Sequence, residues 1–344
     1  MSPAHQQTPQ LDIITFGEAM LLLVADQPGP LEQATTFHKR TAGAETNVAI
    51  GLARLGLKVG WASRLGTDSM GRYLLAAMSA EGIDCSHVVC DASQPTGFQF
   101  KGKVTDGGDP PVESHRKGSA ASHMDVASID EAWLLGARHL HATGVFAALS
   151  ASTLPAARKT MDLMRAAGRS VSFDPNLRPA LWRSTEYMRA SINELAARAD
   201  WVLPGLEEGR LLTGETTPEG IAHFYRQRGA QLVIVKLGSD GAYFEGAASC
   251  NMKFGSNSGA ESGAESGTES GSESGYIPAF SVAKVIDTVG AGDGFAVGVI
   301  SALLDGLSVV QAVTRGAWIG AQAVQVLGDS EGLPTRSALD AAEL

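Results

Sequence analysis

The chain has 344 residues, of which 44% are hydrophobic and 19% are charged, and its formal net charge is −10. This length fits about two domains or one α/β unit, and the composition allows a large core and gives no sign of global disorder. The negative charge argues against a nucleic-acid partner, because binding a phosphate backbone requires clustered Lys and Arg side chains.

The N-terminal segment and the cysteines indicate the compartment. The opening "MSPAHQQTPQ" has no cationic start followed by an apolar stretch, so no signal peptide is expected. No apolar run approaches the roughly 20 residues that a membrane span needs. Cys85, Cys90 and Cys250 form no Cys-x-x-Cys pair, which fits a reducing compartment. We therefore expect a soluble, cytoplasmic protein without a membrane partner.

Short apolar runs alternate with longer helical patterns along most of the chain. Strands are predicted at 11–16, 58–63, 169–174, 200–204 and 231–238, and helices at about 45–56, 69–82, 151–168, 185–199 and 217–229. Such alternation, with nearly continuous apolar strands, predicts a parallel sheet covered on both faces. From Asp293 onward the sequence predicts helices.

Two segments interrupt this alternation. Residues at about 18–42 and 95–117 contain short extended pieces joined by Gly, Pro and Asp. They read as strands of a small second sheet, a lid over the carboxyl ends of the main strands. Open α/β sheets bind ligands at those ends, so we expect the ligand pocket beneath this lid.

Two other segments allow alternative interpretations. His139 and His141 lie two apart in "ARHLHATGV", which on a strand would point them to one face, either as a metal site or as ordinary packed histidines. Residues 255–275 include a Glu-Ser-Gly repeat without apolar side chains, so they cannot offset their ordering entropy. They predict a low-complexity, disordered loop insert between two neighbouring strands, and a binding role for this acidic loop is the alternative.

The stretch "VIDTVGAGDGFAVGV" (285–299) carries the clearest chemical signal. The turn 290–292 leads into Asp293 and a long apolar run, which predicts a buried helix that ends before Gly306. The first N–H groups of a helix have no intrahelical partner and carry partial positive charge. Glycines at that point therefore predict an anion hole for a phosphoryl group.

Asp293 has two interpretations. As a general base of ordinary basicity, kept ionised by the helix dipole, it would orient an attacking hydroxyl beside the anion hole and accept its proton. As an N-cap, it would only stabilise the helix, by about 1 kcal/mol. The chain has no GxxxxGK[ST] motif, and no GxGxxG follows the first strand, which argues against a P-loop enzyme and a Rossmann dehydrogenase.

These residues resemble the second signature of the PfkB (ribokinase-like) carbohydrate kinases, whose form is close to DTxGAGD. "AGAETNVAIGLARLG" (42–56) resembles the family's N-terminal signature, "GTDSMG" (66–71) its G-x-D-x-x-G element, and "VKLGSDGAYF" (235–244) its nucleotide-side strand and turn. The resemblance implies one ribokinase-like domain over residues 11–335. Its expected fold is α/β, a three-layer α/β/α sandwich with a mostly parallel central sheet and a small β lid.

The same resemblance implies an ATP- and magnesium-dependent sugar kinase and assigns roles to residues. Asp293 matches the catalytic base, and Gly290, Ala291 and Gly292 match the anion hole. Gly43 and Asn47 match sugar contacts, and Lys236, Gly238 and Gly241 match the nucleotide side. The alternatives are a polar helix-start residue for Asn47 and a surface cation for Lys236, while Asp68 reads as a helix cap.

Within the family, "HRKGSAAS" (115–122) and "FDPNLRPALW" (173–182) resemble 2-keto-3-deoxygluconate kinases. That substrate carries a carboxylate, which a planar guanidinium binds bidentately, so Arg116 and Arg178 are the candidate cations. A charged hydrogen bond contributes roughly 1.5–3 kcal/mol, about 10- to 150-fold in affinity. Alternatively, Arg178 contacts a phosphoryl oxygen and Arg116 is a solvated loop charge.

Three positions depart from the family pattern, and a fourth matches a cation-linked position of some members. The family's Asn-x-x-Glu near magnesium reads "LPGLEEG" (203–209) here, with Pro204 at the Asn position if Glu207 is the acid that orders magnesium-bound water. Val289 replaces Thr or Ala, and His115 stands where related kinases often carry Tyr. Asp287 matches a position linked to a monovalent cation in some members, so such a cation is a candidate cofactor.

The expected reaction is ATP-dependent phosphorylation of 2-keto-3-deoxygluconate at its 6-hydroxyl, with the small-molecule substrate and ATP as partners. One alternative is a fructokinase- or ribokinase-type enzyme for a neutral sugar, and another is a sugar- or nucleotide-sensing protein without catalysis. Because lids of this family often pair across a dimer, a homo-oligomer is expected. The apolar run 316–328 predicts a helix that is either an adenine wall or plain core.

Overall fold

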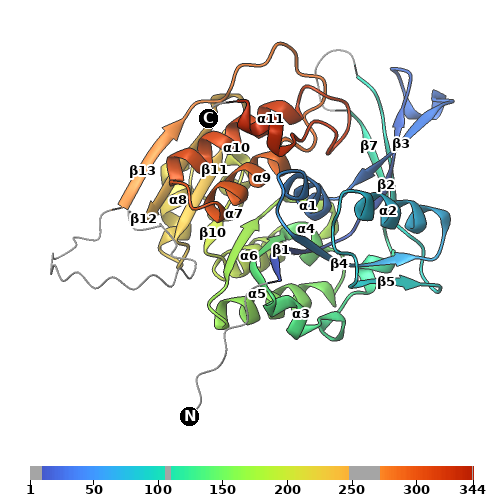
Figure 1. The fold of residues 1–344 in the computed structure, drawn as a ribbon, viewed down its shortest axis with the longest axis horizontal. Coiled ribbons are helices and arrows are strands. Elements are labelled where there is room, and N and C mark those ends of the chain that lie inside the picture. Colours follow the sequence, from blue (N-terminus) through green and yellow to red (C-terminus); the bar gives the residue numbers. More distant parts are fainter. Residues whose placement is uncertain (1–9, 105–109, 248–271, 343) are drawn as a thin grey trace.

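The computed structural model describes residues 10–104, 110–247, 272–342 and 344, and its larger sheet has nine strands (Figure 1). Their order is β13-β12-β11-β10-β9-β8-β1-β4-β5. Neighbours from β5 to β11 pair in parallel, whereas β12 and β13 are antiparallel. The strands are β1 (Leu11–Phe16), β4 (Val59–Gly66), β5 (Val88–Asp91), β8 (Ala137–Thr143), β9 (Ser170–Asp174), β10 (Trp201–Val202), β11 (Leu232–Lys236), β12 (Ala242–Ala247) and β13 (Ser272–Ile277).

Helices cover both faces of this sheet, and each face has its own hydrophobic core. On one face lie α1 (Ala44–Arg54), α2 (Ser69–Ala80), α9 (Ala291–Leu304), α10 (Val309–Ala323) and α11 (Arg336–Asp340). On the other lie α3 (Glu131–Leu135), α4 (Gly144–Ala148), α5 (Thr153–Ala166), α6 (Thr185–Ala196), α7 (Leu206–Thr213) and α8 (Pro218–Arg226). The predicted three-layer α/β/α fold is confirmed. Within the described part of the chain, no helix has the length and apolar character to cross a bilayer.

Helix α9 is buried along almost its whole length. Every residue from Asp293 to Leu304 is buried, as expected for a helix that is apolar nearly all round. It packs against α10 at a point where a Cβ on Gly298 would collide with the backbone of Gly316. The C-cap is Asp305, and Gly306 follows with a φ of 81°, as the sequence predicts.

The predicted small second sheet is also confirmed. Its order is β3-β2-β6-β7, and it lies to one side of the main sheet, at the upper right of Figure 1. Its strands are β2 (Met20–Ala25), β3 (Phe37–Ala42), β6 (Phe98–Lys101) and β7 (Val112–His115). Below, this sheet is called the lid.

The sequence pattern does not reveal α3, α4 or α7. These helices have only five, five and eight residues, too few turns to show a 3.6-residue period. Short 3₁₀ turns occupy Leu31–Gln33, Ala120–His123, Val126–Ser128, Pro179–Leu181 and Gly238–Asp240. Asp68 caps α2 by accepting a hydrogen bond from Gly71 N, as predicted.

One boundary of the predicted disordered insert is wrong. Residues 255–271 lie outside the described residues, but Ser272–Gly275 belong to β13. Gly275 pairs with Phe244 and Ser274 with Glu245 of the antiparallel strand β12. Backbone hydrogen bonding to a neighbouring strand orders these four residues although they have no apolar side chains.

His139 and His141 are packed core histidines. Both are buried on one face of β8, where His139 hydrogen-bonds Ser170 and Ser172 and His141 bonds Ser172. Burial lowers the pKa of His141 to about 3, and the positive charge of Lys236 adds to this effect. No group of three possible metal-ligating side chains occurs in the described residues, so the metal-site alternative has no support there.

Candidate active site

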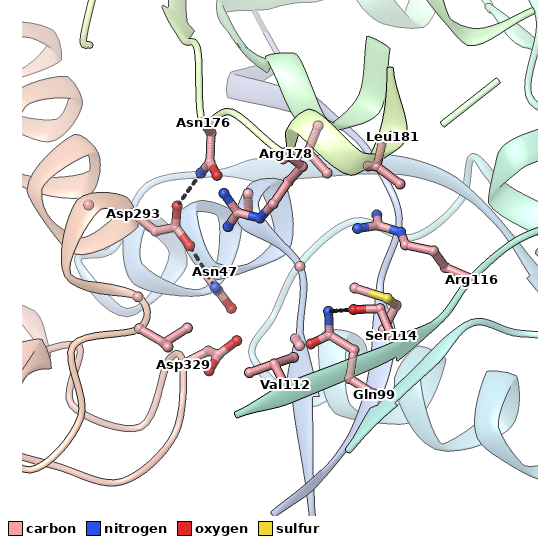
Figure 2. A pocket seen from close by; sticks show the side chains of 18 of the residues that line it. Asn47, Gln99, Val112, Ser114, Arg116, Asn176, Arg178, Leu181, Asp293 and Asp329 are labelled. Carbon is pink, nitrogen blue, oxygen red and sulfur yellow. Dashed lines mark hydrogen bonds between the residues drawn. The ribbon is translucent and has the colours of Figure 1, made fainter. Parts of the chain in front are cut away.

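A cavity of about 1030 Å³ lies between the lid and the carboxyl ends of the main strands. The lid contributes Met20, Gln99, Lys101, Val112 and Ser114, followed by Arg116. The opposite wall includes Asn47, Asn176, Arg178, Glu208, Lys236, Gly290, Asp293 and Asp329, as Figure 2 shows in part. This is the place at which parallel α/β sheets bind ligands.

The start of α9 forms one edge of this cavity. Gly290 is the N-cap with a left-handed φ of 86°, and Ala291 is the first helical residue. A Cβ on Gly290 would collide with the carbonyl oxygen of Asp329, so only glycine fits this turn. Gly290 and Gly292 both line the cavity, so the N-terminal end of the helix, with its partial positive charge, faces it. The turn therefore keeps the anion-binding character that the sequence predicts.

Asp293 is not the N-cap, because Gly290 occupies that position. Its carboxylate accepts one hydrogen bond from Asn47 Nδ2 (2.7 Å) and one from Asn176 Nδ2 (3.2 Å), both drawn in Figure 2. The side chain lines the cavity although the residue is only 8% exposed. Two amides from separate elements thus hold the carboxylate in one orientation, as a reacting group requires.

The expected ordinary basicity of Asp293 is wrong. Burial raises its pKa to about 7. The carboxylates of Asp174 and Asp329 also raise the pKa, whereas the Asn47 hydrogen bond and the Lys236 ammonium lower it. The helix dipole was expected to keep the group ionised. A dipole end contributes up to about 2 kcal/mol, which is less than the loss of hydration of a buried carboxylate.

Asn47 and Gly43 approach the cavity from the start of α1. Asn47 donates a hydrogen bond from Nδ2 to Asp293, and its Oδ1 is buried without a protein partner among the described residues. That oxygen can accept a hydrogen bond from a ligand hydroxyl. Gly43 is the N-cap of α1 with a φ of 142°, and a Cβ there would collide with the Glu18 carbonyl oxygen. Both residues line the cavity, as expected.

Lys236 ends β11 and is an internal cation rather than a surface one. Its Nζ lies 2.6 Å from Asp174 Oδ2 and would be 3.5 Å from a Cβ placed on Gly292. Burial disfavours its charge, but the carboxylates of Asp174 and Glu208 outweigh burial and raise the pKa of Lys236. The ammonium is therefore charged at neutral pH. It lies close to the turn 290–292, which is called the anion turn below.

Gly238 and Gly241 follow in the 3₁₀ turn between β11 and β12. Their φ angles are 62° and 98°, and a Cβ on Gly241 would collide with the Ile277 carbonyl oxygen. Neither residue lines the cavity described above. Their assignment to the nucleotide side stays a prediction.

The two predicted arginines both line the cavity, but within the described residues only Arg116 forms an ion pair. Arg116 donates from Nε and Nη2 to Oε2 of Glu18, at 2.7 and 2.6 Å, and its side chain is 10% exposed. It is therefore not a solvated loop charge. Arg178 donates from Nη1 to the Leu177 carbonyl and has no ion pair among the described residues. Figure 2 shows the Arg178 side chain extending toward Asp293.

Glu207 was predicted as the magnesium-side acid, and the structure contradicts this. Its side chain is 81% exposed and pairs with Arg210 Nη1 at 2.6 Å, outside the cavity. Glu208 lines the cavity and accepts hydrogen bonds from Leu177 N (2.7 Å) and Gly205 N (2.8 Å). Successive helical residues differ by about 100°, so only one of the two glutamates can face inward. With Glu208 as the acid, Gly205 rather than Pro204 stands at the family's Asn position.

Sequence reasoning missed several residues of the site. Asn176 follows Pro175 and has a φ of 38°, held by a hydrogen bond from its N–H to Asp174 Oδ1. Asn is one of the few residues that tolerate this conformation, so the "DPN" stretch could have indicated it. Lys101, by contrast, reaches Asp287 and Asp329 across 186 and 228 residues of sequence, and no local pattern indicates that contact.

The chain is similar in sequence to carbohydrate kinases over nearly its whole length. Residues 10–336 match the model of the pfkB family carbohydrate kinases. The chain is 47% identical over 331 residues to a 2-dehydro-3-deoxygluconokinase of Bacillus subtilis (strain 168), covering 96% of this chain and 94% of that protein. It is 31% identical over 328 residues to a 2-dehydro-3-deoxygluconokinase of Thermoproteus tenax, covering 94% and 92%.

A solved structure is similar as well. The crystal structure of a PfkB protein from Polaromonas sp. JS666 superposes with a TM-score of 0.82 at 73% sequence identity. The match covers 96% of this chain and 99% of that one. The similarity in fold and the similarity in sequence therefore both extend over nearly the whole chain.

Proposed function

The chain belongs to the PfkB family of carbohydrate kinases, and we propose that it transfers the γ-phosphoryl group of ATP to the 6-hydroxyl of 2-keto-3-deoxygluconate. Residues 11–335 would act as a single kinase domain. The observation that carries the proposal is the buried Asp293 carboxylate beside the turn 290–292, in a cavity that also contains two arginines. The sugar is supported by two relatives named for 2-dehydro-3-deoxygluconate, the same compound.

Asp293 is the proposed general base. As the 6-oxygen bonds to the γ-phosphorus, the bond from that phosphorus to the β–γ bridging oxygen breaks and ADP leaves. The hydroxyl proton passes to Asp293, late in a loose transition state. A pKa of about 7 suits this role, because the group must accept a proton and release it again near neutral pH. The amides of Asn47 and Asn176 would aim the carboxylate.

The phosphate side would use the helix start and Lys236. The N–H groups of the turn 290–292 and the Lys236 ammonium would provide positive charge where the transferred group gains negative charge. Gly238 and Gly241 remain our candidates for the nucleotide edge. Mg²⁺ carried by ATP would neutralise phosphate charge. Such ions need only one or two protein carboxylates besides the phosphates, and we assign that role to Glu208, acting through water.

Arg178 is the stronger candidate for the sugar carboxylate. The Arg116 guanidinium is already neutralised by Glu18, which would also repel a second carboxylate. Arg178 carries an unpaired charge among the described residues and can offer a planar fork. We therefore propose that Arg178 binds the carboxylate and that Arg116 shapes the wall beside it. Gly43 and Asn47 would contact sugar hydroxyls.

A coupled ADP-release assay tests the proposed function. The enzyme is given ATP with 2-keto-3-deoxygluconate, and in parallel with fructose and with ribose. We expect the keto-deoxy acid to give the highest kcat/KM. A preference for a neutral sugar would remove the carboxylate argument. Ligand-dependent thermal stabilisation without ADP release would instead indicate a sensing protein.

We also propose that the lid pairs with a second copy of itself. Phe98 stacks on His115 at a centroid distance of 4.7 Å, and Phe100 contacts Phe37 at 5.3 Å, so aromatic rings cluster on partly exposed lid strands. Light scattering of the purified protein would give the oligomeric state.

The free thiols Cys85 and Cys90 support the proposal of a cytoplasmic enzyme.

A further inference from the structure

Lys101 forms a buried ionic junction between the lid and the loops that flank the anion turn. It is the last residue of β6 and is 1% exposed. Its Nζ lies 2.5 Å from Asp287 Oδ2 and 3.0 Å from Asp329 Oδ1. Both carboxylates are buried too, with side-chain exposures of 0% and 8%. A buried cation between two buried carboxylates is unusual enough to need a reason.

The two carboxylates connect this ammonium to the anion turn. Asp287 Oδ1 accepts a hydrogen bond from Val289 N at 3.1 Å, just before Gly290. Asp287 Oδ2 also accepts one from Gly328 N at 3.1 Å, next to Asp329. The Asp329 backbone packs directly against Gly290, where a Cβ would not fit. Lys101 therefore reaches both chain segments that support the turn 290–292.

This arrangement disagrees with a bound monovalent cation at Asp287. The ammonium already supplies one positive charge in direct contact with Asp287 Oδ2. A second cation on the same carboxylate would lie next to that ammonium, and like charges repel strongly at a buried site. In addition, the positive charge of Arg178 acts on Asp329. The two carboxylates thus have two cationic side chains close to them.

We propose that Lys101 takes the place of a monovalent cation at Asp287 and is a positioning residue that ties the lid to the anion turn. The enzyme then needs no added monovalent cation for turnover. This inference rests on the proposed kinase function of the same site. Lys101 acts through Asp287 and Asp329, and it does not itself touch the reacting atoms.

The test uses the full chain in a buffer free of K⁺, Na⁺ and NH₄⁺, with tetramethylammonium chloride as the salt and ATP as its Tris salt. We expect the kcat of the wild type to change less than twofold when KCl replaces tetramethylammonium chloride. Lys101→Ala should lose about 10²-fold in kcat, as misplaced reacting groups do, with a smaller change in the KM for ATP. Added K⁺ or methylammonium should restore at least part of that loss, since either can enter the space vacated.

Matched variants separate positioning from a general loss of charge. Lys103→Met removes a lysine two residues away, whose Nζ donates a hydrogen bond to the Asp26 carbonyl, and should keep wild-type kcat without rescue by K⁺. Lys101→Arg, which keeps the charge, should retain more activity than Lys101→Met. If Lys101→Ala does not fold, Lys101→Met takes its place, with a kcat at least tenfold below wild type as the supporting result.

Two results would overturn the inference. One is a wild-type enzyme that needs K⁺ for activity, and the other is a Lys101 variant with wild-type kcat in tetramethylammonium. Failure of the proposed function looks different, because the wild type would then not phosphorylate the keto-deoxy acid at all. In that case the cation effect is read from melting temperatures, which K⁺ should raise for Lys101→Ala and not for the wild type.

Discussion

Replacing Asp293 with Asn should remove activity and stabilise the fold at the same time. The pKa of this carboxyl moves from 3.8 to about 7, mainly through burial. That change corresponds to about 4 kcal/mol in favour of the protonated form. Because the folded-state pKa is raised, this stabilisation is complete below about pH 4 and is lost as pH rises through about 7. Above pH 7 the wild type therefore carries the full penalty of a buried charge.

The Asp293→Asn variant carries no such penalty. It also loses part of the hydrogen bonding with Asn47 and Asn176, so we expect a net gain of about 1–2 kcal/mol at pH 8. For a chain of this size the melting temperature should rise by about 1.5–3 °C at pH 8 and by less at pH 5. Turnover should fall by at least about 10²-fold, as when a general base is removed.

The assay combines ADP release at saturating substrates with thermal unfolding at pH 5 and pH 8. Asp340→Asn, which makes the same change at an exposed position, serves as the control and should alter neither quantity. Near-normal turnover of Asp293→Asn would refute its role as the base. A stability difference that does not grow between pH 5 and pH 8 would refute burial as the cause of its raised pKa.

Four further predictions concern the wild type and residues in or near its cavity. The kcat/KM of the wild type should fall about tenfold for each pH unit below about 7 and level off above it, because Asp293 must be deprotonated; a flat profile between pH 5 and pH 8 would contradict this. Arg178→Met should raise the KM for the keto-deoxy acid by about 10- to 150-fold and leave that for ATP nearly unchanged. Arg116→Met should lower the unfolding free energy by about 3–5 kcal/mol, because the buried Glu18 carboxylate keeps its Ser119 hydrogen bond but loses its cation. Glu208→Gln should increase the Mg²⁺ concentration needed for half-maximal rate, and Glu207→Gln should not; equal effects of the two would contradict the assignment of Glu208.

The sequence predicts the architecture well because its signals are local. Continuous apolar strands, the apolar helix that begins at Ala291 and the turn chemistry around Gly290 each lie within a few neighbouring residues. The lid is predictable for the same reason, since its two segments break the strand–helix alternation. Motif spacing then identifies the family, and with it Asn47 and Asp293 as members of one site.

What the sequence did not predict depends on contacts between distant segments. The basicity of Asp293 is set by burial and by the carboxylates of Asp174 and Asp329, which come from other parts of the chain. The choice between Glu207 and Glu208 depends on the rotation of α7 about its axis, and a one-residue shift reverses it. The ion pair between Arg116 and Glu18 spans 98 residues and changes which arginine is available for a substrate.

The pairing of β12 with β13 has a practical consequence. Ala247 and Ser272 are register partners, so the chain leaves the outer part of the main sheet and returns to it at one point. The number of residues between them is thereby uncoupled from the rest of the architecture, since loop-closure entropy depends only weakly on length. This position suits the insertion of an affinity tag or a fluorescent reporter. It lies at the β13 edge of the main sheet, and β5 forms the opposite edge.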